Sequence, residues 1–327
     1  MGFAGTGTDV IGGHNIADHA LTIESSFGDG LGTEMYIGNV TKFIRRRGDK
    51  NHYRQGLSQY GTWYDATLLN RRWTGSIELE LNNGVPLALG LGYISATDDP
   101  TLSTLRGPGH PTPVKDFMPS FAFAVETTDG EVKGIKGATV TNLSVTVADN
   151  DKPTTVVLDY VAQAEDATNI TGARVASPSV YGFHKTSLQY DDASPFAAAA
   201  TTITNWTSYT LTVTPKLEIK PTINGTTIRQ PYFKGFGKDG VKLSLDRYVC
   251  DDDFWSTTDF PTTITASFRL NQYIDASNYV YLDSQNVKLD DIEEGVDEEG
   301  LAMHRISLNA RYASASIKDD QTYVAWD

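Results

Sequence analysis

The chain has 327 residues, a formal net charge of −14 and a single cysteine, Cys250. One cysteine excludes an intramolecular disulfide framework, and the excess of carboxylates argues against a surface that grips a nucleic-acid backbone. No apolar run reaches the roughly 20 residues that a membrane-spanning helix needs. The N-terminus lacks the basic and apolar regions of a signal peptide, so we expect none. The many Thr, Gly, Asp and Tyr residues favour strands and turns, which predicts a mainly β fold.

The first 60 or so residues predict an arm, a strand and the start of a long loop. Residues 1–20 are rich in Gly, Thr and Asp and are expected to form an N-terminal arm or loose tail. A strand is predicted over 33–44, and a polar loop over 45–72. This loop mixes arginine with aromatic side chains, which are enriched at protein interfaces. The residues expected to contact other subunits are Arg45, Arg46, Arg47, Tyr53, Tyr60, Trp63 and Tyr64.

The segment from Gly75 to Leu81 alternates apolar and polar residues and predicts a strand with one buried face. Residues 85–93 have the potential for one or two helical turns. A proline-rich loop is expected over 96–117. Three further strands are then predicted around 121–127, 143–147 and 156–160.

The second half repeats this order of elements after a junction over 164–200. Its opening strand is the most regular, and the side chains on its apolar face are predicted to build a barrel: Tyr209, Leu211, Val213, Leu217 and Ile219. A polar loop over 221–239 adds three aromatic contact candidates, Tyr232, Phe233 and Phe236. The segment Gly240 to Asp246 then alternates as 75–81 does, and further strands are expected near 262–270, 278–288 and 302–313.

The two alternating segments lie 164 residues apart (241 − 77), almost half the length of the chain. Such internal repetition predicts two copies of one β-unit in tandem. We therefore expect four regions: an N-terminal arm (1–20), a first β-unit (21–165), a junction (166–200) and a second β-unit (201–327).

In the order and spacing of these elements, the chain resembles the tail tube proteins of long-tailed bacterial and archaeal viruses. The likeness extends over most of residues 20–313. The segments that carry it are Ile23–Gly28, Trp73–Leu79, Gly137–Val147 and Ser208–Lys220.

The resemblance implies β-sandwich units, each with a short flanking helix, whose long strands join between subunits into a barrel around a lumen. Rings of this family usually hold six units, so two units per chain imply trimers with pseudo-sixfold symmetry. The long loops would stack the rings, and the negative charge would let DNA pass without binding. The chain would thus be a structural protein of the virion tail, made in the host cytoplasm. Its partners would be its own copies, the tape measure, terminator and baseplate proteins, and the passing viral DNA, with no membrane partner.

Other features of the sequence bear on alternative functions. The acidic run from Asp290 to Glu299 lacks EF-hand spacing and predicts a solvated hairpin loop or a lumen-facing patch, and Asp251–Asp253 reads the same way. No motif locates a zinc site, a catalytic nucleophile or a phosphate loop, so we expect no enzyme, metal or cofactor. The alternatives are an extracellular β-sandwich binding module or adhesin, a tail terminator or baseplate ring, and last a glycan-cleaving enzyme, which would need paired carboxylates.

Overall fold

The structure is a computed structural model that describes residues 8–55, 63–92, 101–103, 116–148, 152–166, 168–171, 179–191, 196, 200–222, 227–248, 266–275, 278–296 and 300–319. Within these ranges the chain forms sixteen strands and one α-helix, which confirms the predicted mainly β class. No helix in these ranges is long and apolar enough to cross a membrane.

The elements of the first half begin with a short N-terminal strand and end with the strand that precedes the predicted junction. They are β1 (Thr8–Gly12), β2 (Ile16–Ile23), β3 (Asn39–Gln55), β4 (Trp63–Glu80), α1 (Val85–Leu91), β5 (Thr101–Ser103), β6 (Phe121–Thr127), β7 (Val132–Ala148) and β8 (Thr155–Asp166).

The second half contains the remaining strands. They are β9 (Thr186–Asp191), β10 (Thr201–Ile203), β11 (Trp206–Glu218), β12 (Tyr232–Tyr248), β13 (Ala266–Asp275), β14 (Asn278–Val296), β15 (Ala302–Asn309) and β16 (Tyr312–Lys318). The predicted helix near 85–93 and the predicted strand at 121–127 are both confirmed.

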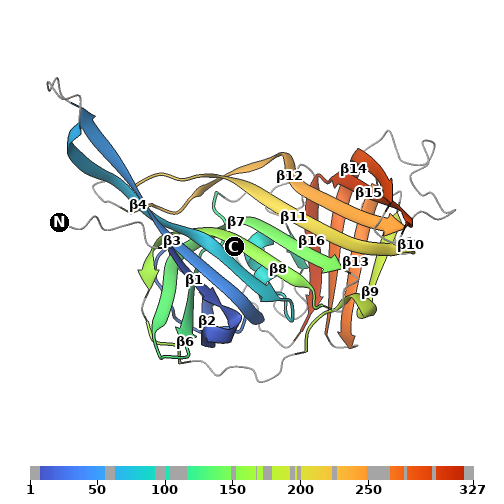
Figure 1. The fold of residues 1–327 in the computed structure, drawn as a ribbon, viewed down its shortest axis with the longest axis horizontal. Coiled ribbons are helices and arrows are strands. Elements are labelled where there is room, and N and C mark those ends of the chain that lie inside the picture. Colours follow the sequence, from blue (N-terminus) through green and yellow to red (C-terminus); the bar gives the residue numbers. More distant parts are fainter. Residues whose placement is uncertain are drawn as a thin grey trace.

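A large antiparallel sheet crosses the whole molecule in the lateral order β1-β3-β4-β8-β7-β11-β12-β15-β14 (Figure 1). Two strands, β7 and β14, are long enough to serve a second set of partners. The first part of β7 pairs with β6, which pairs with β2. The first part of β14 pairs with β13 and β16, and β13 continues to β9 and β10.

The hydrophobic core forms because successive side chains on each strand alternate between the two faces of the sheet. Ile77 and Leu79 of β4 are fully buried, as are Leu211 and Val213 of β11. One continuous cluster joins core residues of both halves.

Helix α1 lies in this core, and all seven of its residues are buried. Its Gly90 packs so closely on β7 that a Cβ there would meet the Leu143 side chain at 2.6 Å. The helix ends at Gly92, whose φ of 86° is the left-handed conformation that glycine adopts most readily.

The loop expected at 45–72 is largely strand, and the loop expected at 221–239 is strand from residue 232 onward, so the first prediction was wrong and the second was wrong for its last part. Strands β3 and β4 pair as far as Gln55 opposite Trp63, and the far end of their hairpin projects from the body of the molecule (Figure 1). Strand β12 begins at Tyr232. A ribbon that projects into solvent needs no apolar face, so its sequence lacks the alternation that marks a half-buried strand.

The assignments for the N-terminus, the junction and the acidic run also need correction. Residues 8–20 form β1 and most of β2, and β9 lies within the predicted junction. The acidic run continues β14 as far as Val296, and the predicted strand at 302–313 is divided between β15 and β16. Asp251–Asp253 lie outside the described residues.

Candidate assembly surfaces

The two halves of the large sheet meet where β7 and β11 pair edge to edge. Their register runs from Ser208 opposite Ala148 to Val213 opposite Leu143. On the core side, Val145 and Leu211 are buried side by side. On the other side, the hydroxyls of Thr146 and Thr210 lie 3.3 Å apart. This β7–β11 joint thus combines a buried apolar face with a neutral polar face.

At one end of the sheet, the second part of β14 is paired along one of its two edges by a described strand. Residues 288–296 pair with β15, and no described strand pairs with their other edge. Four carboxylates on this stretch are exposed: Asp290, Asp291, Glu293 and Glu294. Exposed edges are templates for pairing with another chain, and charged side chains are a common way to restrict which chain pairs.

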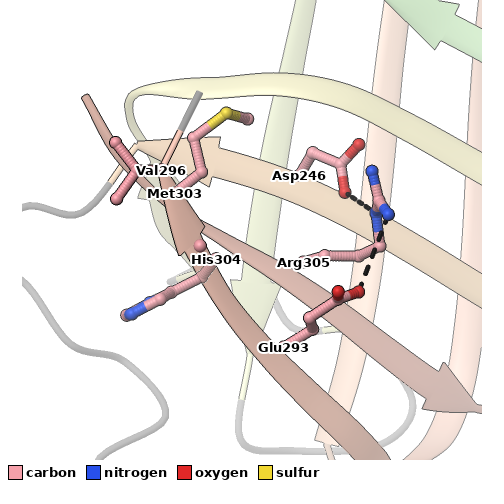
Figure 2. A pocket seen from close by; sticks show the side chains of 7 residues that line it. Asp246, Glu293, Val296, Met303, His304 and Arg305 are labelled. Atoms are coloured by element: carbon pink, nitrogen blue, oxygen red, sulfur yellow. Dashed lines mark hydrogen bonds and ion pairs between the residues drawn. The ribbon is translucent and has the colours of Figure 1, made fainter. Parts of the chain in front are cut away.

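Figure 2 shows how the side chains near this edge are arranged. The Arg305 guanidinium of β15 lies between Asp246 of β12, at 3.1 Å, and Glu293 of β14, at 3.7 Å. His304 points away from these three, and its Nε2 is 3.8 Å from Glu294 Oε1. Asp246, Glu293, His304 and Arg305 are among the residues that line a shallow depression of about 240 Å³. Within the described ranges, no group of three or more potential ligands is placed to hold a metal ion.

At the other end of the sheet, β1 covers the edge of β3. The register places Asp9 opposite Arg45, Val10 opposite Ile44 and Ile11 opposite Phe43. Ile11 is buried, whereas Val10 is 60% exposed. This ladder is only five residues long, so β1 is a small cover on a long strand.

Arg45 of the predicted contact cluster is buried in its own chain. Its guanidinium contacts Asp9 Oδ2 at 2.8 Å and Glu165 Oε1 at 2.7 Å, donates to the Gly134 carbonyl, and lies 5.3 Å from the Trp73 ring centre. Arg46 is exposed on β3, and Arg47 is half-buried beside it. The predicted contacts of these arginines with a neighbouring subunit remain predictions.

The aromatic contact candidates fall into two groups. Tyr53, Trp63 and Tyr64 lie on the β3–β4 hairpin, and Tyr60 lies outside the described residues. The second group packs within the chain. The Tyr232 ring centre is 4.7 Å from that of Phe117, and the Phe233 ring centre is 5.2 Å from that of Phe236.

The predicted barrel residues lie on or next to β11. Tyr209, Leu211 and Val213 are buried on one face, as the alternation requires. Leu217 is half-buried after two register irregularities around Pro215, and Ile219 lies just past the end of the strand. The apolar face is therefore confirmed for the first three residues, which lie where β11 pairs with β7.

The Tyr160 hydroxyl of β8 reaches past Gly75 of β4 and holds β3 to the sheet. The Tyr160 hydroxyl donates to the Ile44 carbonyl at 2.8 Å, passing over Gly75. A Cβ at position 75 would lie 1.8 Å from that carbonyl oxygen and 2.7 Å from the Tyr160 hydroxyl. Burial raises the pKa of the Tyr160 hydroxyl above its ordinary value, and the Arg45 cation opposes this shift.

The sequence matches no known protein-family model, and no curated protein is significantly similar to it. The function is therefore inferred from the chain's own geometry.

Proposed function

We propose that this chain is a structural subunit that assembles with copies of itself into stacked rings, as the tail tube of a long-tailed virus. The observation that carries the proposal is a scheme of strand pairing that occurs twice and is joined edge to edge. In the first half the pairing runs β2-β6-β7-β8-β4-β3. In the second half it runs β9-β13-β14-β15-β12-β11.

The match extends to single positions in the ladders. Ile77 of β4 is flanked by Phe43 of β3 and Leu158 of β8. In the same way, Leu243 of β12 is flanked by Leu211 of β11 and Leu308 of β15. Both sets of six strands also follow the chain in the same order. This agreement supports two tandem β-units of one kind.

Ring closure follows from repeating one joint. Within the chain, β7 of the first unit pairs with β11 of the second. The corresponding strands at the ends of the sheet are β14 and β3, so the same joint can form between copies. A head-to-tail joint of this kind closes into a ring when the rotations add up to a full turn. Two units per chain and six units per ring give a trimer.

The polar face of the large sheet would line the lumen of such a ring. It carries a few apolar side chains, such as Val157 and Ile44, but mainly hydroxyls and charges, among them Ser76, Glu78, Thr146, Thr210, Lys242, Ser244 and Asp246. Together with the net charge of −14, this surface would repel the DNA phosphates and let viral DNA pass unbound. The chain would have no enzymatic role.

The projecting β3–β4 hairpin would contact the next ring in the stack. It carries Arg46, Tyr53, Trp63 and Tyr64, which are residue types enriched at interfaces. Tape measure, terminator and baseplate proteins would then be the further partners in the virion tail.

Light scattering coupled to size exclusion, followed by negative-stain imaging of each peak, tests the proposal. We expect trimers, or hollow tubes of stacked rings. A single ring that never stacks would favour a terminator or baseplate protein. A monomer that persists at high concentration would overturn self-assembly and favour a binding module.

A further inference from the structure

Strand β1 takes up, beside β3, the place that β7 takes up beside β11. Leu211 of β11 lies between Val145 of β7 and Leu243 of β12. The corresponding residue of β3, Phe43, lies between Ile11 of β1 and Ile77 of β4. Both outer strands run antiparallel to the strand that they cover. The edge of β3 that would form the joint between copies is thus already occupied by five residues of the chain's own N-terminal region.

The in-chain joint fixes which residues would meet between copies. Leu143 and Val145 of β7 lie opposite Leu158 and Val156 of β8. In β14 the corresponding positions, opposite Leu308 and Ile306 of β15, are Leu289 and Ile292, with one extra residue in the bulge between Leu289 and Asp291.

Transferring the β7–β11 register to these positions places Ile292 opposite Phe43 of the second copy. It also places Glu293 opposite Lys42, in the arrangement that Thr146 and Thr210 have within the chain. An acidic strand would therefore meet a basic one, because Lys42, Arg45 and Arg46 lie on β3.

The sequence of β1 partly resembles that of the β14 edge. Ile11 now lies opposite Phe43, where Ile292 would lie. Asp9 pairs with the Arg45 guanidinium, opposite which the transferred register places Leu289, beside the bulge at Asp290. The resemblance is incomplete, because Gly12 stands opposite Lys42, where β14 would supply the Glu293 carboxylate. An incoming β14 would therefore offer the same apolar contact and bring the Glu293 carboxylate to Lys42, in place of the Asp9–Arg45 pair that β1 makes.

We propose that β1 caps the β3 edge in the free chain and gives way to residues 288–296 of β14 from a second copy. This inference rests on the proposed function, because it names the partner and the control of the same assembly edge. The cap would keep newly made chains from pairing at random, a hazard of any exposed edge.

A disulfide that holds β1 in place tests the cap directly. Val10 and Ile44 lie opposite each other in the ladder, away from the buried face, so Val10→Cys and Ile44→Cys are placed to form a cross-strand bond. The background carries Cys250→Ser, which removes the only native thiol. We expect the oxidised protein to lose at least tenfold in assembly rate, and reduction to restore the rate of the Cys250→Ser parent.

The matched control is a disulfide inside the sheet. Ser244→Cys and Ser307→Cys join β12 and β15 at a directly opposed pair that has no role in the proposed exchange, so its oxidation should leave assembly unchanged. If the oxidised Val10→Cys/Ile44→Cys protein assembles as fast as the reduced one, the cap is refuted while self-assembly stands. If the Cys250→Ser parent and the wild type both stay monomeric, the proposed function itself fails.

A second pair of cysteines tests the register between copies. Lys42→Cys and Glu293→Cys, again with Cys250→Ser, should form interchain disulfides in assembled protein, visible as covalent dimers and trimers. The control variant combines Lys42→Cys with Val296→Cys, which places the second thiol three residues further along β14. Its cross-linking should be at least fivefold lower. Rings that form without any Lys42–Glu293 cross-link would overturn the exchange.

Discussion

The joint inside the chain and the two ends of the sheet differ in one respect that bears on assembly. Between β7 and β11 the polar face of the joint carries two threonine hydroxyls, 3.3 Å apart. At the corresponding positions of the free ends stand Lys42 and Glu293. Units linked by the same chain meet in every copy, so neutral contacts suffice. Separate copies must find one another in the right register, and opposite charges contribute more to that selection than to affinity.

The largest expected effect comes from a charge in the apolar face of the in-chain joint. Val213 of β11 is fully buried opposite Leu143. Val213→Asp should lower the free energy of unfolding by about 3–5 kcal/mol, because an unpaired carboxylate is left in the core. Urea unfolding measures this loss. Thr212→Asp, on the polar face of the same strand, is the control and should change stability by less than about 0.5 kcal/mol. Normal folding and assembly of Val213→Asp would show that this face of β11 was assigned wrongly.

The next effect concerns the free ends and leaves the fold intact. Glu293→Lys would face Lys42 of the second copy with a like charge, so we expect assembly to weaken at least tenfold, or about 1.4 kcal/mol. Both side chains are exposed in the free chain, so its unfolding midpoint should hardly move. The concentration at which light scattering detects oligomers is the measurement.

The reciprocal change sharpens this test. Lys42→Glu alone should weaken assembly to a similar extent, and the double variant Lys42→Glu/Glu293→Lys should recover most of the loss. A double variant no better than either single one would mean that these two positions do not meet.

A smaller effect concerns the tie between β3 and the sheet. Tyr160→Phe removes the hydroxyl that donates to the Ile44 carbonyl, which should cost about 1 kcal/mol in the free energy of unfolding. Burial raises the pKa of this hydroxyl in the folded chain, so the folded chain keeps the proton longer than the unfolded one. The resulting stability is therefore complete below the ordinary tyrosine pKa of about 10 and is lost as the pH rises above it.

Urea unfolding at pH 8 and at pH 11 checks this sign. The wild type should lose more stability between the two pH values than Tyr160→Phe does. Tyr209, whose pKa burial also raises, would account for part of the loss that remains in the variant. Equal losses in both proteins would mean that Tyr160 does not carry the alkaline dependence.

The smallest effect belongs to the neutral joint. Thr146→Val removes one of the two facing hydroxyls and keeps the shape of the side chain, so stability and assembly should both change by less than about 0.5 kcal/mol. A large loss of assembly here would mean that assembly depends as strongly on the side chains of the in-chain joint as on those of the two ends.

Strands whose apolar and polar residues alternate were predictable from the sequence, whereas strands without this alternation were not. Ile77 and Leu79 alternate with polar residues because one face of β4 lies on the core, and β11 follows the same rule from Tyr209 to Val213. The acidic part of β14 and the outer part of the β3–β4 hairpin carry no such alternation. They are strands because of their pairing partners, which a local pattern does not contain.

The candidate site was predictable only in part for the same reason. The arginine run predicted contacts of β3 with a neighbouring subunit, but Arg45 is buried against Asp9 and Glu165 of its own chain. Lys42, Ile11 and Glu293 were missed, because their roles follow from lateral register across several strands. The sequence signal for Ile11 is the likeness between Asp9-Val10-Ile11 and Asp290-Asp291-Ile292, which includes neither Lys42 nor Glu293.

The measurement that tests self-assembly by two units per chain most directly is end-on imaging of the rings, with class averages sharp enough to resolve single lobes. We expect six similar lobes in which every second one is identical, so that threefold symmetry holds strictly and sixfold symmetry only approximately. Six identical lobes, or a field of single particles with no ring at any concentration, would contradict it.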